Sequence, residues 1–345
     1  MFGKKISLLQ FALYTLIIFA LAVVSFNIIG KKSERDLHMV SGRGTNTDDN
    51  CGQNAIRLSG FKYIRPLLGS ERECESLEKY SLLKNGIKAY IENEQQSGNI
   101  AAVSVYLEDC GNNDWMGIDA EDLFMPGSLL KMPTLLTYLK MAETNPDLLE
   151  KELLFNSKEF PQPPKQTFDS ATIQSGRRYK VRDLIRNMLV HSDNYSTWLL
   201  NSKMNVETYK KVYAEIGIPT PVDYSYKISA KNYSKLLKVL YDGDYVSASH
   251  SEYAISLLLD CDFKNGMVKK LPPSVKVAHK FGEAGTIEFS ELHESGLVYI
   301  GTAPYLLTVM TKGKNVVNQA EVISNISKMV YDQMLAMNGE LLAAR

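Results

Sequence analysis

Two stretches of the chain repeat apolar residues at steps of three and four, the spacing of one helix face. In the first, residues 73–96, the apolar positions Leu77, Tyr80, Leu83, Ile87 and Ile91 recur in this way, and Gly98 ends the pattern. The second, residues 317–337, lies near the carboxyl end. Both stretches predict amphipathic helices with one buried face.

Shorter apolar or alternating stretches between turn residues predict strands. Residues 101–107 and 115–118 predict a hairpin, and residues 275–281, 296–300 and 305–310 predict a three-stranded meander. The intervening helical patterns cover residues 127–142, 181–190, 195–201, 206–216, 229–241 and 251–259. We therefore predict an α/β protein of the α+β type. Its five-stranded antiparallel sheet is flanked by the N- and C-terminal helices, and an all-helical lobe is inserted between the second and third strands.

The amino-terminal region differs from the rest in its hydropathy. Residues 6–29 are uncharged and mostly apolar, which is long enough for a helix to span a membrane. No small-residue cleavage site precedes Gly30, so a retained single-pass anchor is favoured over a cleaved signal. The predicted organisation is a short terminus at 1–5, a transmembrane anchor at 6–29, a linker and docking arm at 30–72, and one domain at 73–340.

Charge and cysteine content narrow the function classes. The 345 residues carry a formal net charge of zero, which argues against nucleic acid as a partner. The four cysteines, Cys51, Cys74, Cys110 and Cys261, form no C-x-x-C pair, so we expect no metal site, and we expect no cofactor. One or two disulfides and free buried thiols both remain open.

The first candidate catalytic residue is Ser128, which follows the turn Pro126-Gly127 and precedes Lys131 by three residues. At a helix start this spacing places the amine beside the hydroxyl, and an unprotonated lysine can activate a serine nucleophile. The same Ser-x-x-Lys spacing recurs at Ser76/Lys79 and Ser81/Lys84, without the Pro-Gly turn. The turn therefore favours Ser128.

Two further motifs follow in order: Ser192-Asp193-Asn194 in a predicted helix break, and Lys280-Phe281-Gly282 on a predicted strand. With Ser128-x-x-Lys131 they resemble the S-x-x-K, S-D-N and K-T-G motifs of the serine β-lactamase and penicillin-binding-protein superfamily, closest to class A β-lactamases. The resemblance covers residues 73–337. It implies a bacterial protein whose body faces outward, so the predicted anchor would hold the body on the outer side of the cell membrane.

The resemblance also implies roles for the matching residues. Ser128 is the expected acylated nucleophile, Lys131 its base, and Ser192 the proton relay to the leaving nitrogen. Asn194 is expected to bind a substrate amide. Lys280 and Gly282 belong to the substrate-binding strand, and Lys280 supplies positive charge for a carboxylate. The expected oxyanion hole consists of the backbone N–H groups of residues 128 and 283.

Two departures from the family pattern concern turnover and recognition. Phe281 stands where the family has a threonine hydroxyl that binds the substrate carboxylate. The stretch 217–228, which corresponds to the loop that carries the deacylating glutamate, contains no Glu, and its one acid, Asp223, is expected to be a turn residue. Glu283 is the remaining candidate catalytic acid, ahead of His279 and His293, which we expect to be structural.

Two hypotheses follow. The first is an active serine hydrolase or acyltransferase that acts on a β-lactam or a peptidoglycan stem peptide, with slow or absent β-lactam turnover. The second is a non-hydrolysing penicillin-binding or structural protein of the same fold whose site is residual.

Overall fold

A computed structural model of the protein describes residues 57–68, 74–75, 78–164, 166–168, 171–223, 225–286, 288–301 and 303–343. The segment 6–29 lies outside these ranges, so the predicted anchor stays a prediction. Within the described ranges, no helix is both long and apolar enough to cross a membrane.

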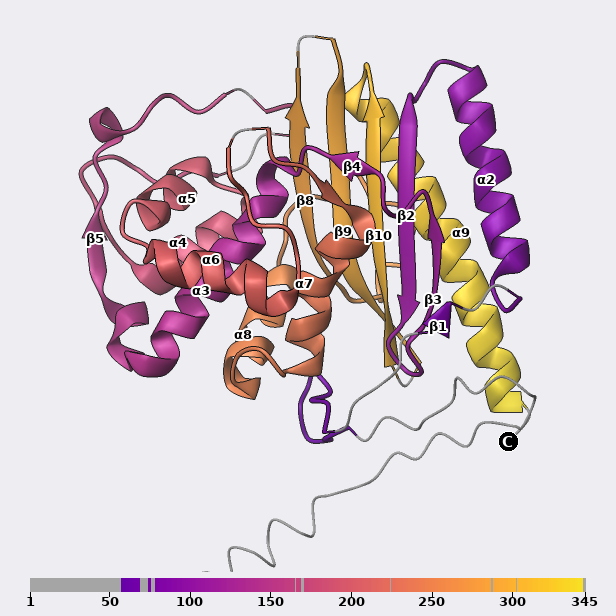
Figure 1. The fold of residues 1–345 in the computed structure, drawn as a ribbon, viewed down its shortest axis with the longest axis horizontal. Coiled ribbons are helices and arrows are strands. Elements are labelled where there is room, and N and C mark those ends of the chain that lie inside the picture. Colours follow the sequence, from indigo (N-terminus) through magenta and orange to yellow (C-terminus); the bar gives the residue numbers. More distant parts are fainter. Residues whose placement is uncertain are drawn as a thin grey trace, which may run out of the picture.

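The body is built on one twisted sheet with helices on both faces (Figure 1). The five predicted antiparallel strands are present, in the spatial order β3, β2, β10, β9, β8. Their bounds are β2 Ala102–Asp109, β3 Asp114–Ile118, β8 Val277–Gly285, β9 Ser290–Ile300 and β10 Ala303–Gly313. The predicted order of hairpin, inserted lobe and meander is therefore confirmed.

Two predicted boundaries were wrong. The first helix, α2, covers Ser81–Gln96, whereas Cys74–Glu75 form a short strand, β1, that pairs in parallel with the outer edge of β3. The sheet is thus six-stranded, because this edge takes up backbone groups of the preceding chain. Strand β9 begins at Ser290, so His293 lies inside it and not before it.

Each face of the sheet has its own core. On one face, α2 and α9 (Val316–Ala343) cover a cluster that includes Leu83, Ile87 and Ile323. On the other face, α7 (Ala230–Asp242), α8 (Ala248–Leu259) and the rest of the lobe bury a second cluster. The two clusters explain why the apolar stripes of the terminal helices and the lobe helices face opposite sides of the sheet.

The inserted lobe contains short elements that prepare the site. In chain order they are β4 Leu123–Phe124, η1 Gly127–Leu130, α3 Lys131–Thr144, η2 Pro146–Glu150, β5 Glu152–Leu154, η3 Ser157–Glu159, β6 Arg178–Lys180, α4 Val181–Val190, α5 Asn194–Asn201, α6 Val206–Ile216 and β7 Ile228–Ser229. Helices α4 and α6 have the predicted bounds. Side chains cap α5, α6 and α7 from Asp193, Asn205 and Ser229, as polar N-cap residues do in general.

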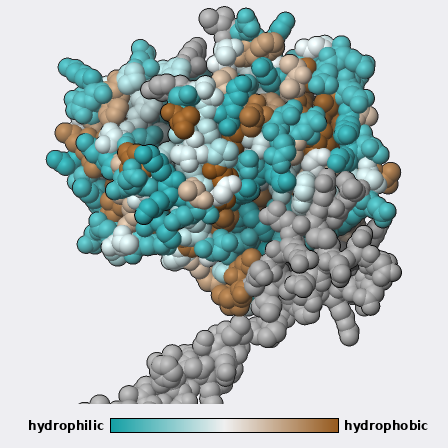
Figure 2. All heavy atoms as spheres, viewed as in Figure 1, coloured by the Kyte–Doolittle hydropathy of each residue, from teal (hydrophilic) through white to brown (hydrophobic). Residues whose placement is uncertain are grey.

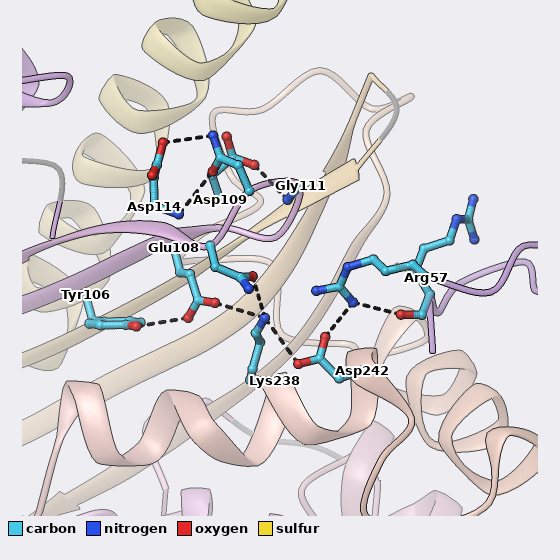
Figure 3. A network of polar contacts seen from close by, with 11 residues as sticks. Arg57, Tyr106, Glu108, Asp109, Gly111, Asp114, Lys238 and Asp242 are labelled. Atoms are coloured by element: carbon cyan, nitrogen blue, oxygen red, sulfur yellow. Dashed lines mark hydrogen bonds and ion pairs between the residues drawn. The ribbon is translucent and has the colours of Figure 1, made fainter. Parts of the chain in front are cut away.

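The arm formed by residues 57–68 docks onto the end of α7. Its backbone N–H groups at Arg65 and Leu67 donate to the carbonyls of Tyr241 and Asp242. The Arg57 guanidinium pairs with the Asp242 carboxylate at 2.7 Å, and Asp242 also pairs with Lys238 (Figure 3). This buried network joins the arm to the sheet through Glu108 on β2.

The surface drawn in Figure 2 is mostly hydrophilic, with hydrophobic residues in small groups, one of them at the lower edge where Figure 1 places the arm. Cys110 and Cys261 are free, buried thiols. The side chains of Cys51 and Cys74 lie outside the described part of the chain, so their pairing stays open.

Candidate active site

The serine that the sequence favours lies where the lobe meets the sheet. Gly127 adopts φ +52°, and a Cβ on it would lie 2.3 Å from the backbone oxygen of Glu283. A Cβ on Gly282 would lie 2.5 Å from the Pro126 carbonyl and 2.8 Å from the Leu129 nitrogen. Glycine at both positions therefore lets the 3-10 turn η1 rest directly on β8. This contact brings the backbones around residues 128 and 283 together.

The segment before the turn is fixed from the sheet. Glu291 and His293, both on β9, hold the two backbone groups of Met125: the N–H donates to Glu291 Oε2 at 2.7 Å, and His293 Nε2 donates to the carbonyl at 2.9 Å. His293 Nδ1 also faces the Thr311 N–H at 3.2 Å, so both ring nitrogens are engaged. His293 is thus a structural residue that positions the approach to Ser128.

Lys131 joins three of the predicted site residues. Its Nζ lies 3.0 Å from Ser128 Oγ, 3.0 Å from Ser192 Oγ and 2.9 Å from Asn194 Oδ1, and it also donates to the Ser192 carbonyl. Lys131 is 3% exposed. Burial, and next the positive charge of Lys280, hold the pKa of the Lys131 amine well below its ordinary value, against an opposing effect of Asp193. A lysine in this state is able to take a proton from a hydroxyl.

Ser192 is held in a costly backbone conformation. Its φ of +52° lies in the left-handed region, which costs a residue other than glycine about 1–3 kcal/mol. Asp193 maintains this turn as the N-cap of α5, accepting from the Ser196 N–H at 2.8 Å and from Thr172 Oγ1 at 2.5 Å. Asp193 therefore braces its own turn.

Lys280 completes the group from the strand side. Its Nζ donates to Ser192 Oγ at 2.9 Å and to the Phe281 carbonyl at 2.9 Å. The side chain is fully buried, and this burial lowers the pKa of Lys280 to about 8, against the opposing effects of Cys261, Asp262 and Glu294. Ser192 Oγ therefore stands between two buried amines.

Phe281 does not occupy the place of a threonine hydroxyl in the cleft. Its ring stacks on Phe263 with centroids 4.3 Å apart and is 1% exposed. Phe168 packs edge-on against Phe263. The ring therefore belongs to the buried cluster that contains Phe263, and Lys280 Nζ lies 4.3 Å from its centroid.

A cleft of about 610 Å³ opens beside the Ser192 turn. One wall is the turn itself, from His191 to Tyr195, and the other is the loop between η3 and β6, including Gln162, Pro163, Pro164 and Gln166. Two hydrogen bonds hold the loop in place: Thr167 donates to the Glu283 carboxylate on β8, and Thr172 donates to the Asp193 carboxylate before α5. Sequence reasoning missed this loop as part of the site, since its threonines carry no recognisable motif.

The structure thus brings together Ser128, Lys131, Ser192, Asn194 and Lys280, with Gly282 against the turn that holds Ser128. The Glu283 carboxylate is hydrogen-bonded to Thr167, 2.9 Å from its Oγ1. His279 pairs with Glu294 at 2.6 Å inside the core. No group of three His, Cys, Asp or Glu side chains that could hold a metal ion occurs in the described ranges.

Comparison with protein families matches residues 82–334 to the model of the β-lactamase enzyme family. The chain belongs to this family. The match spans the five antiparallel strands and the whole inserted lobe, from α2 to α9. A search of curated protein sequences finds no match.

Solved structures show the same fold at low sequence identity. PBP-A aligns with a TM-score of 0.64 and 16% identity, over 77% of this chain and 99% of PBP-A. TLA-1 extended-spectrum β-lactamase aligns with a TM-score of 0.65 and 15% identity, over 75% of this chain and 100% of TLA-1. A class A β-lactamase from Bacteroides cellulosilyticus aligns with a TM-score of 0.63 and 16% identity, over 74% and 99%.

Within this β-lactamase family fold, one expected feature is absent from the described residues of the loop after α6. Residues 217–223 and 225–228 contain no glutamate, and Asp223 accepts from the Ser225 backbone at 2.7 Å and from its hydroxyl at 2.5 Å. Asp223 is therefore a turn residue, as predicted.

Proposed function

We propose that this member of the β-lactamase family is a serine hydrolase or acyltransferase that forms an acyl-enzyme on Ser128 with a β-lactam or a cell-wall peptide. The observation that carries the proposal is the placement of the buried Lys131 amine 3.0 Å from both Ser128 Oγ and Ser192 Oγ. A hydroxyl and a base at hydrogen-bond distance are the requirement for nucleophilic attack by serine.

The proposed chemistry begins when Ser128 Oγ attacks the carbonyl carbon and its proton passes to Lys131 Nζ. The proton then moves through Ser192 Oγ to the leaving nitrogen as the C–N bond breaks. The backbone N–H groups of residues 128 and 283 stabilise the oxyanion. In this scheme Asn194 binds the substrate amide and Lys280 attracts the substrate carboxylate.

Deacylation is proposed to be slow. Asp223 is engaged in its own turn. Glu283, the other candidate acid, would have to release Thr167 before it could act on a water molecule. A missing general base costs on the order of 10²–10⁴ in rate. A substituted form of PBP-A has been solved as an acyl-enzyme complex with penicillin G, and we extend this stable acylation to the present chain.

A second candidate function is a binding or structural role with a residual site. The observation that favours it is Phe281, which removes the family's carboxylate-binding hydroxyl and turns its ring into the core. In that case the Ser128 hydroxyl would not be acylated by a β-lactam or a cell-wall peptide.

Labelling with a fluorescent penicillin tests the proposal. The wild-type chain should carry the label, and mass spectrometry of the tryptic peptides should locate it on Ser128. Ser128→Ala should abolish labelling, whereas Ser81→Ala, which changes the matched Ser-x-x-Lys in α2, should leave it intact. Absence of label from a folded wild-type chain would favour the second candidate, and label on Ser81 would refute the assignment of the nucleophile.

We also propose that residues 6–29 anchor the protein in the cell membrane with the body outside the cytoplasm. The support is the uncharged apolar run and the absence of a cleavage site before Gly30. Protease added to intact spheroplasts should then remove the body. A body that stays protected until the cells are lysed would contradict the proposal.

A further inference from the structure

A second pocket lies at the opposite end of the sheet from Ser128. It has a volume of about 240 Å³ and is formed where the arm meets the turn between β9 and β10. Its lining includes Lys62, Tyr63 and Arg65 of the arm, Tyr241 of α7, Lys276 just before β8, and Tyr299 of β9. The Gly282 contact with the nucleophile turn is near the other end of β8, so the two sites are separate.

The charged residues that line this pocket are all cations. Among its described lining residues there are two lysines and one arginine and no carboxylate. Lys62 Nζ lies 4.9 Å and Lys276 Nζ 5.7 Å from the centroid of the same Tyr63 ring. Both ammonium groups therefore lie at one aromatic side chain of the pocket wall, and an anion bound at this wall would be attracted by both charges.

The nearby acid Glu252 is engaged with the backbone of the arm. Its carboxylate accepts the N–H groups of residues 62, 63 and 64 at 2.7–3.1 Å. Glu252 holds the arm in place and raises the pKa of Lys62 only as a minor cause, after the contact with Tyr63. Arg65 is oriented in turn, because its Nη1 donates to the carbonyls of Phe61 and Ile64.

The wall of the pocket also contains an unsatisfied polar group. Tyr241 is 1% exposed, and its hydroxyl has no hydrogen-bond partner among the described residues. Burial raises the pKa of Tyr241, so the hydroxyl stays a donor at neutral pH. A buried hydroxyl without a partner costs about 1–3 kcal/mol, which a bound acceptor would recover.

We propose that this pocket binds a phosphate group, carried by a lipid headgroup or free in solution. Three cations match a doubly charged oxyanion, and the guanidinium and tyrosine hydroxyl provide directional donors. The volume is below the roughly 300–1,000 Å³ of sites for drug-sized ligands, which suits a phosphate. In the sequence, the arm that builds the pocket directly follows the predicted anchor and linker.

Calorimetric titration of the full-length chain in neutral detergent tests the proposal. The probes are inorganic phosphate, glycerol 1-phosphate, and phosphatidic acid in mixed micelles, at constant ionic strength. At least one should bind at a 1:1 ratio. Lys276→Ala and Arg65→Ala should each weaken this binding about tenfold, the usual loss for one charge-assisted contact. Lys203→Ala, an exposed lysine outside the pocket, should leave it unchanged.

The tyrosine gives a sharper comparison. Tyr241→Phe removes only the hydroxyl and should weaken binding about threefold to tenfold, a typical effect of one neutral hydrogen bond. Tyr80→Phe is the matched control, because Tyr80 is also 1% exposed with a hydroxyl that lacks a described partner, but it lies in the core beside α2. Circular dichroism verifies that each variant is folded.

The outcomes separate cleanly. Binding of glycerol 1-phosphate and phosphatidic acid without inorganic phosphate would identify a headgroup site, and binding of all three would identify a site for phosphate itself. The proposal is overturned if no probe binds saturably at millimolar concentration, if Lys203→Ala acts like Lys276→Ala, or if Tyr241→Phe has no effect and the hydroxyl is simply hydrated. None of these readouts depends on acylation of Ser128.

Discussion

Replacing Lys280 by methionine should shift the pH dependence of acylation to more alkaline pH. Methionine keeps a long apolar stem in the buried position but removes the charge. The Lys131 and Lys280 amines each lie within 3.0 Å of Ser192 Oγ, so they are at most about 6 Å apart. At this separation two charges interact by roughly 3 kcal/mol at an effective dielectric constant of about 20. The ionisation equilibrium of Lys131 should change on the order of a hundredfold.

The sign follows from the charge. A neighbouring cation disfavours the protonated form of Lys131, so its removal raises the pKa of Lys131 and leaves less neutral base at pH 7. The effect should be largest below pH 8, where Lys280, whose pKa is about 8, is charged. Because the two amines interact, the pKa values observed in the wild type belong to the pair and not to either lysine alone.

The assay is the second-order rate constant for acylation by a fluorescent penicillin from pH 6 to pH 10, for the wild type and Lys280→Met. Lys276→Ala, on an exposed lysine immediately before β8, is the control. We expect a higher midpoint in Lys280→Met and partial recovery of the rate at high pH. A uniform loss of rate with an unchanged midpoint would refute the reasoning, since Lys280 would then act only on the substrate carboxylate.

Three further predictions concern the same site. Gly282→Ala should lower the thermal midpoint and slow acylation, because the new Cβ would push the Pro126 carbonyl away and destabilise the fold by about 1–3 kcal/mol. An unchanged acylation rate would show that the turn accommodates the Cβ. Phe281→Thr should lower the free energy of unfolding in urea by about 3 kcal/mol or more, since it removes a ring stacked on Phe263. It should not raise the rate of penicillin acylation, and a faster reaction would mean that residue 281 does reach the substrate. The acyl-enzyme on Ser128 should persist in intact-protein mass spectra, and nitrocefin turnover should stay below ~10 s⁻¹, the median of competent enzymes; steady turnover above that rate would reveal a base that we have not identified.

Much of the fold could be predicted from the sequence because its signals are local. The three- and four-residue spacing of apolar positions predicted α4 and α6 with the bounds that the structure shows. Alternation and turn residues predicted the strands of the meander, although β9 begins earlier, at Ser290. Its first half was missed because Glu291, His293 and Ser295 are polar, and they are buried only by partners distant in the sequence.

For the candidate site too, the sequence predicted some features, and only the folded structure showed the others. The order of Ser128-x-x-Lys131, Ser192-Asp193-Asn194 and Lys280-Phe281-Gly282 is a property of the chain, and it indicated the family and the residues that converge. Only the tertiary structure decided that the Lys131 amine reaches Ser128, Ser192 and Asn194 at once. It also decided that the Phe281 ring is buried against Phe263, and that the Thr167 hydroxyl donates a hydrogen bond to the Glu283 carboxylate. The physical reason is that a side chain's role depends on which distant segment packs against it. Spacing along the chain determines which face a residue occupies, but the burial and charges around it come from the folded whole.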